Sequence, residues 1–336
     1  MGITGKELAA LLGISEAAVS MALNGKPGVG EKRREQIVAA AKAYGYDFSR
    51  IEERSEKEGA IAFVIYKKSG AVVTDSPFFS QLAEGVSRGC RLNKRGMRIF
   101  YVYEKEEAAS VIRQMQGPQC AGFILLATEM QEADLAAFRK SGLPMVVLDA
   151  YFETIIENYI LINNMQGAYI ATDYIIRRCK CQPGYLHSAY SIANFEERAD
   201  GFYKAVRSHG MSSSKSVVHR LTPSIEGAYA DMSICIRQGD EIAGCYFADN
   251  DMLAIGAMRA LSEHGYRIPE DVSVIGFDDI SYCNSTNPPL TTVSVPKMSL
   301  GQTAVERLLQ MIANPEEQHC LKIEIATQLV KRKSVQ

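Results

Sequence analysis

Residues 15–30, SEAAVSMALNGKPGVG, have the pattern of one short helix that ends in two turns. Ser15 is a typical helix N-cap, and the dipeptides Asn24-Gly25 and Pro27-Gly28 are turn formers that stop a helix. One face of this helix carries an apolar stripe made of Val19, Ala22 and Leu23. A helix this short is not stable alone, so it needs packing partners from the flanking segments.

The flanking segments add one helix on each side. Thr4 and Glu7 have the spacing of a capping box at the start of a first helix, and Gly13 ends that helix. A third helix extends from Glu31 to Tyr44, with an inward face formed by Ile37, Ala40, Ala41 and Tyr44. Residues 1–46 therefore form a three-helix unit. Its first two helices have the helix-turn-helix layout of DNA-binding proteins, although a plain helical bundle has the same pattern.

The pattern changes after residue 46. Residues 47–58, DFSRIEERSEKE, are charged and nearly devoid of apolar side chains, which is typical of a linker. Short apolar runs then alternate with amphipathic helices, as in parallel sheets covered on both faces. We expect strands at 61–66, 97–102, 122–126, 144–148, 242–247 and 272–277, and helices such as 79–93 and 167–178. This βα pattern is too long for one open sheet, so we expect two similar lobes.

Composition limits the classes of function. The chain has 336 residues and a net charge of -2, so it has no global basic field. No apolar run approaches the ~20 residues that span a bilayer, and the N-terminus lacks a signal-peptide pattern, so we expect a cytoplasmic protein without a membrane partner. The eight cysteines and five histidines lack metal-like spacing, and Cys179 and Cys181 are the only close pair of thiols. We expect free thiols, no metal and no cofactor.

Enzyme motifs are missing from the sequence. It contains no Gly-x-Ser-x-Gly elbow and no Gly-x-x-x-x-Gly-Lys phosphate loop, and the glycines of residues 25–30 follow a helix instead of a strand. We therefore expect no catalytic residues. Polar side chains instead follow predicted strands, with Asp149, residues 249–251 and residues 278–279 at strand ends. In open α/β sheets ligands bind beyond the carboxyl ends of the strands, so these residues are expected to line one crevice.

Several stretches together resemble the lactose/galactose repressor (LacI/GalR) family. The headpiece of that family is matched by TGKELA at 4–9, AVSMALNGKPGV at 18–29 and AYGY at 43–46. Its core is matched by SPFF at 76–79, ERADGF at 197–202, NDMLAIG at 250–256, PEDVSVIGFDD at 269–279 and PLTTV at 289–293, and residues 330–334 fit its last strand. The resemblance covers almost the whole chain.

This resemblance implies an all-α helix-turn-helix headpiece followed by an α/β core of two lobes, similar to periplasmic binding proteins, with two parallel doubly wound sheets. We assign residues 1–46 to the headpiece and residues 47–58 to a hinge. The N-terminal lobe is expected at 59–160 plus 291–319, and the C-terminal lobe at 161–290 plus 320–333. The implied function is a ligand-responsive transcriptional regulator, a repressor in most of the family. It would bind a double-stranded DNA operator of two-fold symmetry as a homodimer.

A small effector between the lobes is the second partner that the resemblance implies, and the residue chemistry favours a sugar or sugar derivative. The expected effector residues are Phe78, Phe79, Asp149, Arg198, Asn250 and Asp278. Arg198 is a fork for paired hydroxyls, Asp278 accepts from hydroxyls, and a phenylalanine ring covers the apolar side of a sugar. Structural alternatives remain open: an Arg198–Asp278 ion pair, core phenylalanines, and an Asp149 that only satisfies a turn. Asp251 and Asp279 are expected to act at helix starts.

The expected DNA-binding residues are Thr4, Ser15, Glu16, Ala17, Ser20, Met21 and Asn24. Glu16, Ala17 and Met21 depart from the polar or basic residues that the family usually has there. Since Glu16 can accept from a cytosine amino group and Ala17 can contact a thymine methyl group, we expect an operator unlike the family consensus. Ser15 and Ser20 remain available to phosphates.

The hinge also departs from the family, because Glu52 and Glu53 lie near its centre and the usual leucine wedge is missing. We expect a flexible hinge that does not kink DNA; the other possibility is that Ile51 acts as the wedge in a shifted register. Two alternatives to the whole interpretation remain. One is a ligand-binding protein with a degenerate headpiece and no DNA function, and the other is a regulator with a nucleobase or protein co-effector.

Overall fold

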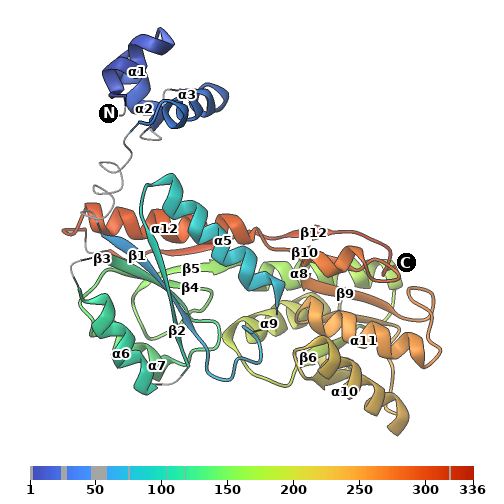
Figure 1. Ribbon diagram of the computed structural model, residues 1–336. Helices are drawn as coiled ribbons and strands as arrows, with labels where there is room; N and C mark the ends of the chain where they lie inside the picture. Colours follow the sequence, from blue (N-terminus) through green and yellow to red (C-terminus); the bar gives the residue numbers. More distant parts are fainter. Residues whose placement is uncertain are drawn as a thin grey trace.

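The computed structural model describes residues 3–23, 29–46, 59–74, 76–103, 105–117, 119–317 and 319–336. The predicted turns at Asn24-Gly25 and Pro27-Gly28 and the hinge at 47–58 lie outside the described residues. None of the helices within the described ranges is long and apolar enough to cross a membrane. Three small helices come first in the chain, and a two-lobed α/β core follows (Figure 1).

The headpiece helices are α1 (Gly5–Leu12), α2 (Glu16–Leu23) and α3 (Glu31–Ala43). The predicted capping box is confirmed, because the Thr4 hydroxyl accepts from the Glu7 amide at 3.3 Å while Glu7 Oε2 accepts from the Thr4 amide at 2.8 Å. Gly13 ends α1 in the left-handed region with φ 63°. Ser15 caps α2, since its Oγ accepts from the Ala18 amide at 3.1 Å.

A small apolar core holds the three helices together, and its buried members are Leu8, Ala9, Val19 and Ala41. One part of the prediction is wrong, because Tyr44 does not face inward and is 55% exposed. The physical reason is that α3 ends at Ala43, so Tyr44 sits at the C-cap, past the helical periodicity. Tyr46 packs against the core instead.

The first lobe is built on a sheet of parallel strands in the order β11-β5-β4-β3-β1-β2. The strands are β1 (Ala60–Tyr66), β2 (Met97–Val102), β3 (Cys120–Leu126), β4 (Met145–Leu148), β5 (Asn158–Ile162) and β11 (Lys322–Ile325). One face is covered by α5 (Pro77–Leu92) and α12 (Lys297–Ala313), which lie side by side. The other face is covered by α6 (Lys105–Met115) and α7 (Glu132–Arg139).

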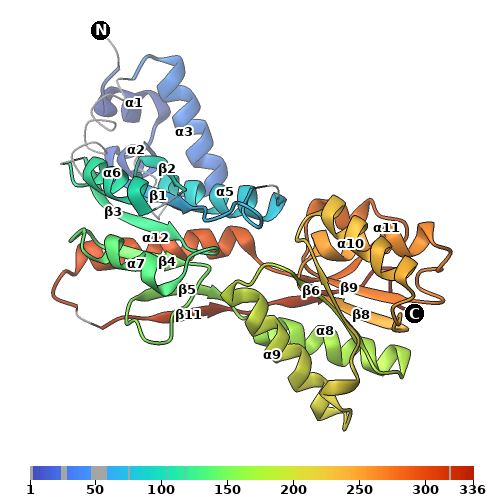
Figure 2. The same cartoon turned by 90° about the horizontal axis from the view of Figure 1, so that it is seen from below.

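The second lobe repeats this plan. Its sheet has the order β12-β10-β9-β8-β6-β7, in which β12 is antiparallel to β10 and the other pairs are parallel. The strands are β6 (Gly184–Ser188), β7 (Val218–Leu221), β8 (Cys245–Ala248), β9 (Ser273–Asp278), β10 (Thr291–Ser294) and β12 (Gln328–Val330). Figure 2 shows α8 (Asn164–Cys179) and α9 (Ala193–Ser208) on one side of this sheet, and α10 (Ile225–Gln238) and α11 (Asp251–Glu263) on the other.

The boundaries between the lobes differ from the expected ones. We expected the chain to return to the first lobe at 291 and to the second lobe at 320. Instead, β10 pairs with β9 in the second sheet, and β11 pairs with β5 in the first. The chain thus crosses between β5 and α8, between β10 and α12, and between β11 and β12. The two misassigned strands have the sequences TTVS and KIEI, which are short and half polar and therefore lack the apolar run that marks a buried strand.

Candidate functional site

The cleft between the lobes lies at the carboxyl ends of strands from both sheets. It is lined by Val72, Ser76, Phe78, Phe79, Thr128, Asp149, Ile192, Asn194, Phe195, Arg198, Asn250 and Asp278. All six residues that we expected to bind an effector are among them. The enclosed space is only about 20 Å³, which is roughly the room for one water molecule. The polar groups of the cleft therefore satisfy one another in this arrangement of the lobes.

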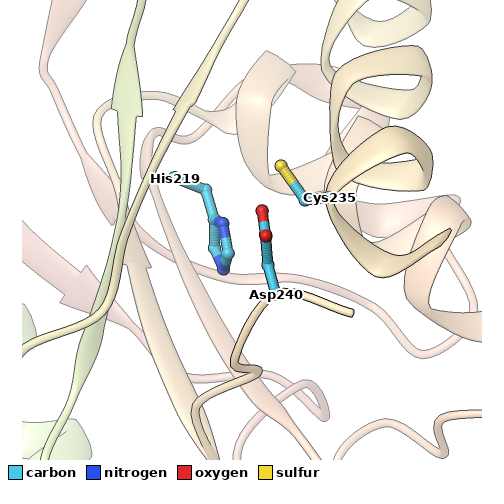
Figure 3. Close-up of side chains that lie close together, drawn as sticks. All are labelled: His219, Cys235 and Asp240. Carbon is cyan, nitrogen blue, oxygen red and sulfur yellow. The ribbon is translucent and has the colours of Figure 1, made fainter. Parts of the chain in front are cut away.

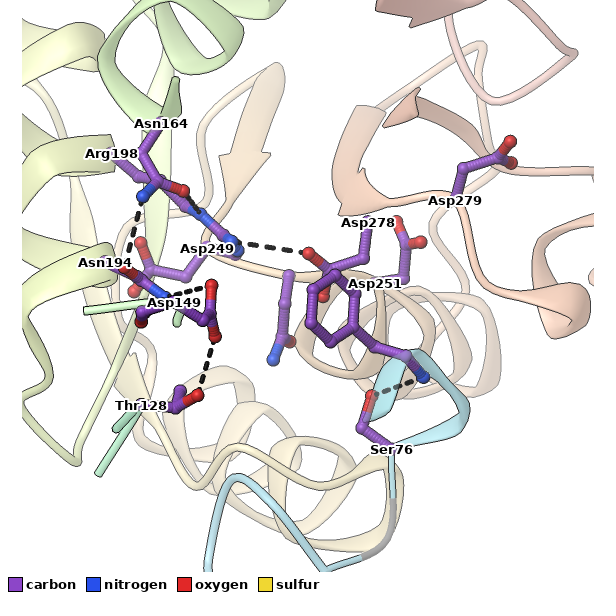
Figure 4. Close-up of polar contacts among 12 residues, drawn as sticks. Ser76, Thr128, Asp149, Asn164, Asn194, Arg198, Asp249, Asp251, Asp278 and Asp279 are labelled. Atoms are coloured by element: carbon purple, nitrogen blue, oxygen red, sulfur yellow. Dashed lines mark hydrogen bonds and ion pairs between the residues drawn. The ribbon is translucent and has the colours of Figure 1, made fainter. Parts of the chain in front are cut away.

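Arg198 is the centre of the polar network (Figure 4). It projects from α9, and its Nε donates to Asn164 Oδ1 at 2.9 Å while its Nη1 donates to the Asp249 carbonyl at 2.5 Å. Its Nη2 lies 3.3 Å from Asp278 Oδ1, and its guanidinium carbon lies 3.8 Å from the centre of the Phe277 ring. Only 3% of Arg198 is exposed. Three directions of its fork are thus fixed before any ligand binds.

Two aspartates face this network from opposite lobes. Asp149 follows β4 and has φ 64°, whereas Asp278 ends β9 with φ 112°, so each side chain is aimed by a left-handed backbone. Asp149 accepts from the Thr128 hydroxyl at 2.6 Å and, across the cleft, from Asn194 Nδ2 at 3.0 Å. Burial raises the pKa of Asp149 to about 7. Burial also raises the pKa of Asp278, while the charge of Arg198 acts in the opposite direction.

Asn250 lines the cleft and also starts a helix. Its Oδ1 accepts from the Leu253 amide at 3.0 Å, so it is the N-cap of α11. Its neighbour Asp251 is buried below and accepts from the Ile280 amide at 2.9 Å and the Thr292 hydroxyl at 2.5 Å. Asp279 pairs with Arg332 at 2.7 Å. Neither Asp251 nor Asp279 lines the cleft, which agrees with the structural roles that we expected for them.

The two phenylalanines contribute in different ways. Ser76 caps α5, because its hydroxyl accepts from the Phe78 amide at 3.3 Å. Phe78 is buried and belongs to the main apolar core, whereas Phe79 is half-buried, and their rings meet edge to face at 5.0 Å. Phe78 therefore acts as a core residue as well as a wall of the cleft, so the two interpretations of it are compatible.

Sequence reasoning missed four polar residues of this network: Thr128, Asn164, Asn194 and Asp249. Thr128 and Asp249 follow β3 and β8, so a stricter use of the strand-end rule would have found them. Asn164 and Asn194 sit in the first turns of α8 and α9, where no apolar run precedes them. Nothing in the pattern of those two segments pointed to the cleft.

On the headpiece, the described DNA-binding candidates occupy the starts of two helices. Thr4, Ser15, Glu16, Ala17 and Ser20 are exposed, Met21 is half-buried, and Asn24 lies outside the described residues. The hydroxyls of Thr4 and Ser15 already act as helix caps. The exposed face of α2 therefore presents Glu16, Ala17 and Ser20 most directly.

A third group of polar side chains lies in the second lobe, away from the cleft. Figure 3 shows His219, Cys235 and Asp240 facing one another, with their potential ligand atoms within 4.8 Å. They come from three different segments, so their positions in the sequence do not indicate a cluster. His219 Nε2 already bonds to the Tyr246 hydroxyl at 3.0 Å. Three side chains are one fewer than a closed structural zinc site uses, and we assign no metal to them.

Known proteins resemble the chain along its whole length. A family model described as a periplasmic binding protein-like domain matches residues 184–335. The HTH-type transcriptional repressor PurR of Aliivibrio salmonicida is 28% identical over 98% of this chain and 98% of its own. The HTH-type transcriptional regulator GalR of Escherichia coli is also 28% identical, over 98% of this chain and 95% of its own. A solved LacI family regulator from Enterococcus faecium with bound ribose has a TM-score of 0.71 and 25% identity, over 82% of this chain and 98% of that one.

Proposed function

Because the chain belongs to the LacI/GalR family of transcriptional regulators, we propose that it is a repressor that binds a two-fold-symmetric DNA operator as a homodimer. A small effector, a sugar or sugar derivative, binds between the lobes and sets its affinity for DNA. The observation that carries the proposal is the cleft itself, in which polar side chains of both lobes meet at the carboxyl ends of their sheets. We expect the protein to act in the cytoplasm, without catalytic activity.

The geometry of the cleft supports a polyol ligand. Arg198 and Asp278 form a donor and acceptor pair that can bind two adjacent hydroxyls, and Phe78 supplies an apolar wall. The similar protein from Enterococcus faecium has ribose bound. With only about 20 Å³ enclosed, a sugar must replace contacts such as Asn194 to Asp149 and separate the lobes. A ligand that favours one lobe arrangement in this way shifts the population of the dimer that fits the operator.

The headpiece supports DNA binding through α2. Its exposed start carries Glu16, Ala17 and Ser20, and the capped helices give it a defined surface. One such headpiece makes few contacts, so useful affinity requires two tethered copies. The surface differs from that of a typical reader, since it offers an acidic and a small side chain.

The effector class is tested by a thermal-shift screen of the full chain with sugars, sugar phosphates and nucleobases. We expect stabilisation by a sugar or sugar phosphate, and its loss in Arg198→Met. Arg207→Met, an exposed residue on the same helix, is the matched control and should respond like the wild type. Stabilisation by a nucleobase alone would overturn the sugar assignment in favour of a nucleobase co-effector.

DNA function is tested by a mobility-shift assay with the DNA upstream of the protein's own gene. Salt-sensitive binding to a two-fold-symmetric site supports the repressor. The absence of binding at any salt concentration favours the second candidate, a ligand-binding protein with a degenerate headpiece. The observation behind that candidate is the unusual set Glu16, Ala17 and Met21 on α2.

A further inference from the structure

A second and much larger cavity lies where the two lobes meet on the side of α8 and α9. Its volume is about 680 Å³, within the range of roughly 300–1,000 Å³ of small-molecule sites. The first lobe contributes Tyr151 and the strand β11, and the second lobe contributes α8 and α9 (Figure 2). A ligand in this cavity therefore contacts both lobes, and its affinity depends on the angle between them.

The lining of the cavity is acidic and partly aromatic. Its charged side chains are Glu153, Glu197, Asp200, Lys204, Lys322 and Glu324. Lys322 is already paired with Glu324, at 3.1 Å, and its ammonium group lies 3.8 Å from the centre of the Tyr151 ring. This contact shows the chemistry that the cavity accepts, because an ammonium group rests there on an aromatic face beside a carboxylate. The remaining carboxylates outnumber the remaining ammonium group, so the cavity attracts organic cations.

One side chain connects this cavity to the effector cleft. Glu197 lines the cavity, and its Oε2 accepts from Asn164 Nδ2 at 2.8 Å. Asn164 is almost completely buried, and its Oδ1 accepts from Arg198 Nε at 2.9 Å. The close approach of α9 to α8 depends on Gly201, where a Cβ atom would collide with the Met165 carbonyl. Asn164 therefore bonds at once to a wall of the cavity and to the central side chain of the cleft.

We propose that this cavity is a second ligand site, which takes an aliphatic diamine or polyamine and acts on the effector cleft through Asn164 as a positioning residue. One ammonium group binds near Glu197 and Asp200, and the other binds toward Tyr151 and Glu153. Neutralising Glu197 changes its bond to Asn164 and thereby the orientation of Arg198. Binding of the amine stands on the cavity alone, whereas any effect on repression rests on the proposed function.

Binding is tested by calorimetry of the full chain with 1,4-diaminobutane and with spermidine. The neutral isostere 1,4-butanediol and sodium chloride at matched ionic strength serve as ligand controls. We expect saturable binding of the amines only, weakened at least about tenfold in Glu197→Gln, which removes a charge-assisted contact. Glutamine keeps an oxygen that accepts from Asn164, so the fold is retained. Glu196→Gln, the exposed neighbour that bonds to Ser191, should bind amines like the wild type.

Equal heats for the amines and the matched salt, or an unchanged affinity in Glu197→Gln, would overturn the site. This measurement contains neither DNA nor effector. A chain that binds amines but no operator therefore contradicts the proposed function and leaves the amine site standing. A chain that binds operator but no amine contradicts the amine site and leaves the proposed function standing.

The connection to the cleft is tested with a fluorescent reporter. The chain has no tryptophan, so Phe79→Trp places a single one at the cleft. We expect 1,4-diaminobutane to shift its emission, and we expect the additional change Asn164→Ala to abolish that shift while calorimetry still detects the amine. Glu197→Gln in the same background provides a second, milder break of the link. Amine binding without any change in emission in the Phe79→Trp chain would contradict the role of Asn164.

Discussion

The interlobe cleft and the exposed face of α2 are the two candidate recognition surfaces, and they are built in opposite ways. In the cleft, Arg198 is held by three polar partners and an aromatic ring, and only 3% of it is exposed. On α2, Glu16 and Ala17 are exposed side chains on a short, capped helix. A substitution in the cleft therefore changes folding and binding together. A substitution on α2 changes the choice of DNA and leaves the fold intact.

The largest expected effect is that of Arg198→Ala. This change leaves Asp278 buried without its positive partner, which costs about 3–5 kcal/mol of unfolding free energy. Urea unfolding of the full chain measures the loss. Arg207→Ala on the same helix is exposed and should stay within about 0.5 kcal/mol of the wild type. Similar losses in the two variants would mean that the cleft network is not structural, and the contrast with α2 would disappear.

The second prediction concerns the core beneath α2. Leu8 is fully buried in the small headpiece core, so Leu8→Ala should cost about 3 kcal/mol locally. We expect the headpiece transition to be lost in a thermal scan, together with DNA binding, while the transition of the two-lobed core stays in place. Leu11→Ala on the same helix is the control, because Leu11 is 51% exposed. Coupled loss of both transitions would show that headpiece and core unfold as one unit.

The third prediction uses pH to test the burial of the cleft. The folded pKa of Asp149 is about 7, above the ordinary 3.8 of an aspartate, so the folded state binds more protons between these values. The stabilisation from this group is complete below about pH 4 and is lost as the pH rises through 7, at no more than about 1.4 kcal/mol per pH unit. Asp149→Asn should remove this part of the pH dependence of unfolding. Glu196→Gln, at an exposed carboxylate, should retain it.

A wild-type and Asp149→Asn pair with parallel stability curves between pH 5 and 8 would contradict this prediction. Asp251 also has a pKa raised by burial to about 7, so the wild-type slope contains a second contribution. The difference between the two curves isolates Asp149, because Asp251 is present in both proteins.

The two surfaces also differ in how far the sequence predicts them. The caps of α1 and α2 depend on residues three positions apart, so Thr4 with Glu7 and Ser15 could be predicted from local spacing. Asp149, Asn250 and Asp278 could be predicted because strand ends in parallel sheets converge on one edge. Asn164 and Asn194 could not, since their roles arise only when helix starts of one lobe meet the other residues of the cleft.

The misassigned strands have a similar cause. β10 and β11 join sheets whose other strands are distant in sequence, and their short sequences are half polar. Pairing partners at such distances leave no local periodic signal, so the sequence pattern located the lobes but placed two of their three connections wrongly.

The smallest effect on stability and the sharpest on specificity is expected for Glu16→Ala. Glu16 is exposed in the first turn of α2, so its removal should change the unfolding free energy by less than about 0.5 kcal/mol. If its carboxylate accepts from a cytosine amino group, the variant loses about 1–3 kcal/mol of discrimination at one position of each half-site. Binding to systematically varied half-sites measures this loss.

The control for this measurement is Glu35→Ala, because Glu35 is an exposed carboxylate on α3 outside the predicted readers. Both variants remove one negative charge from the headpiece, so a uniform gain in DNA affinity is expected in each. Only Glu16→Ala should also change the order of preference among the half-sites. An unchanged base preference in Glu16→Ala would show that α2 contacts DNA through its backbone and caps alone, and that its acidic side chain is not a reader.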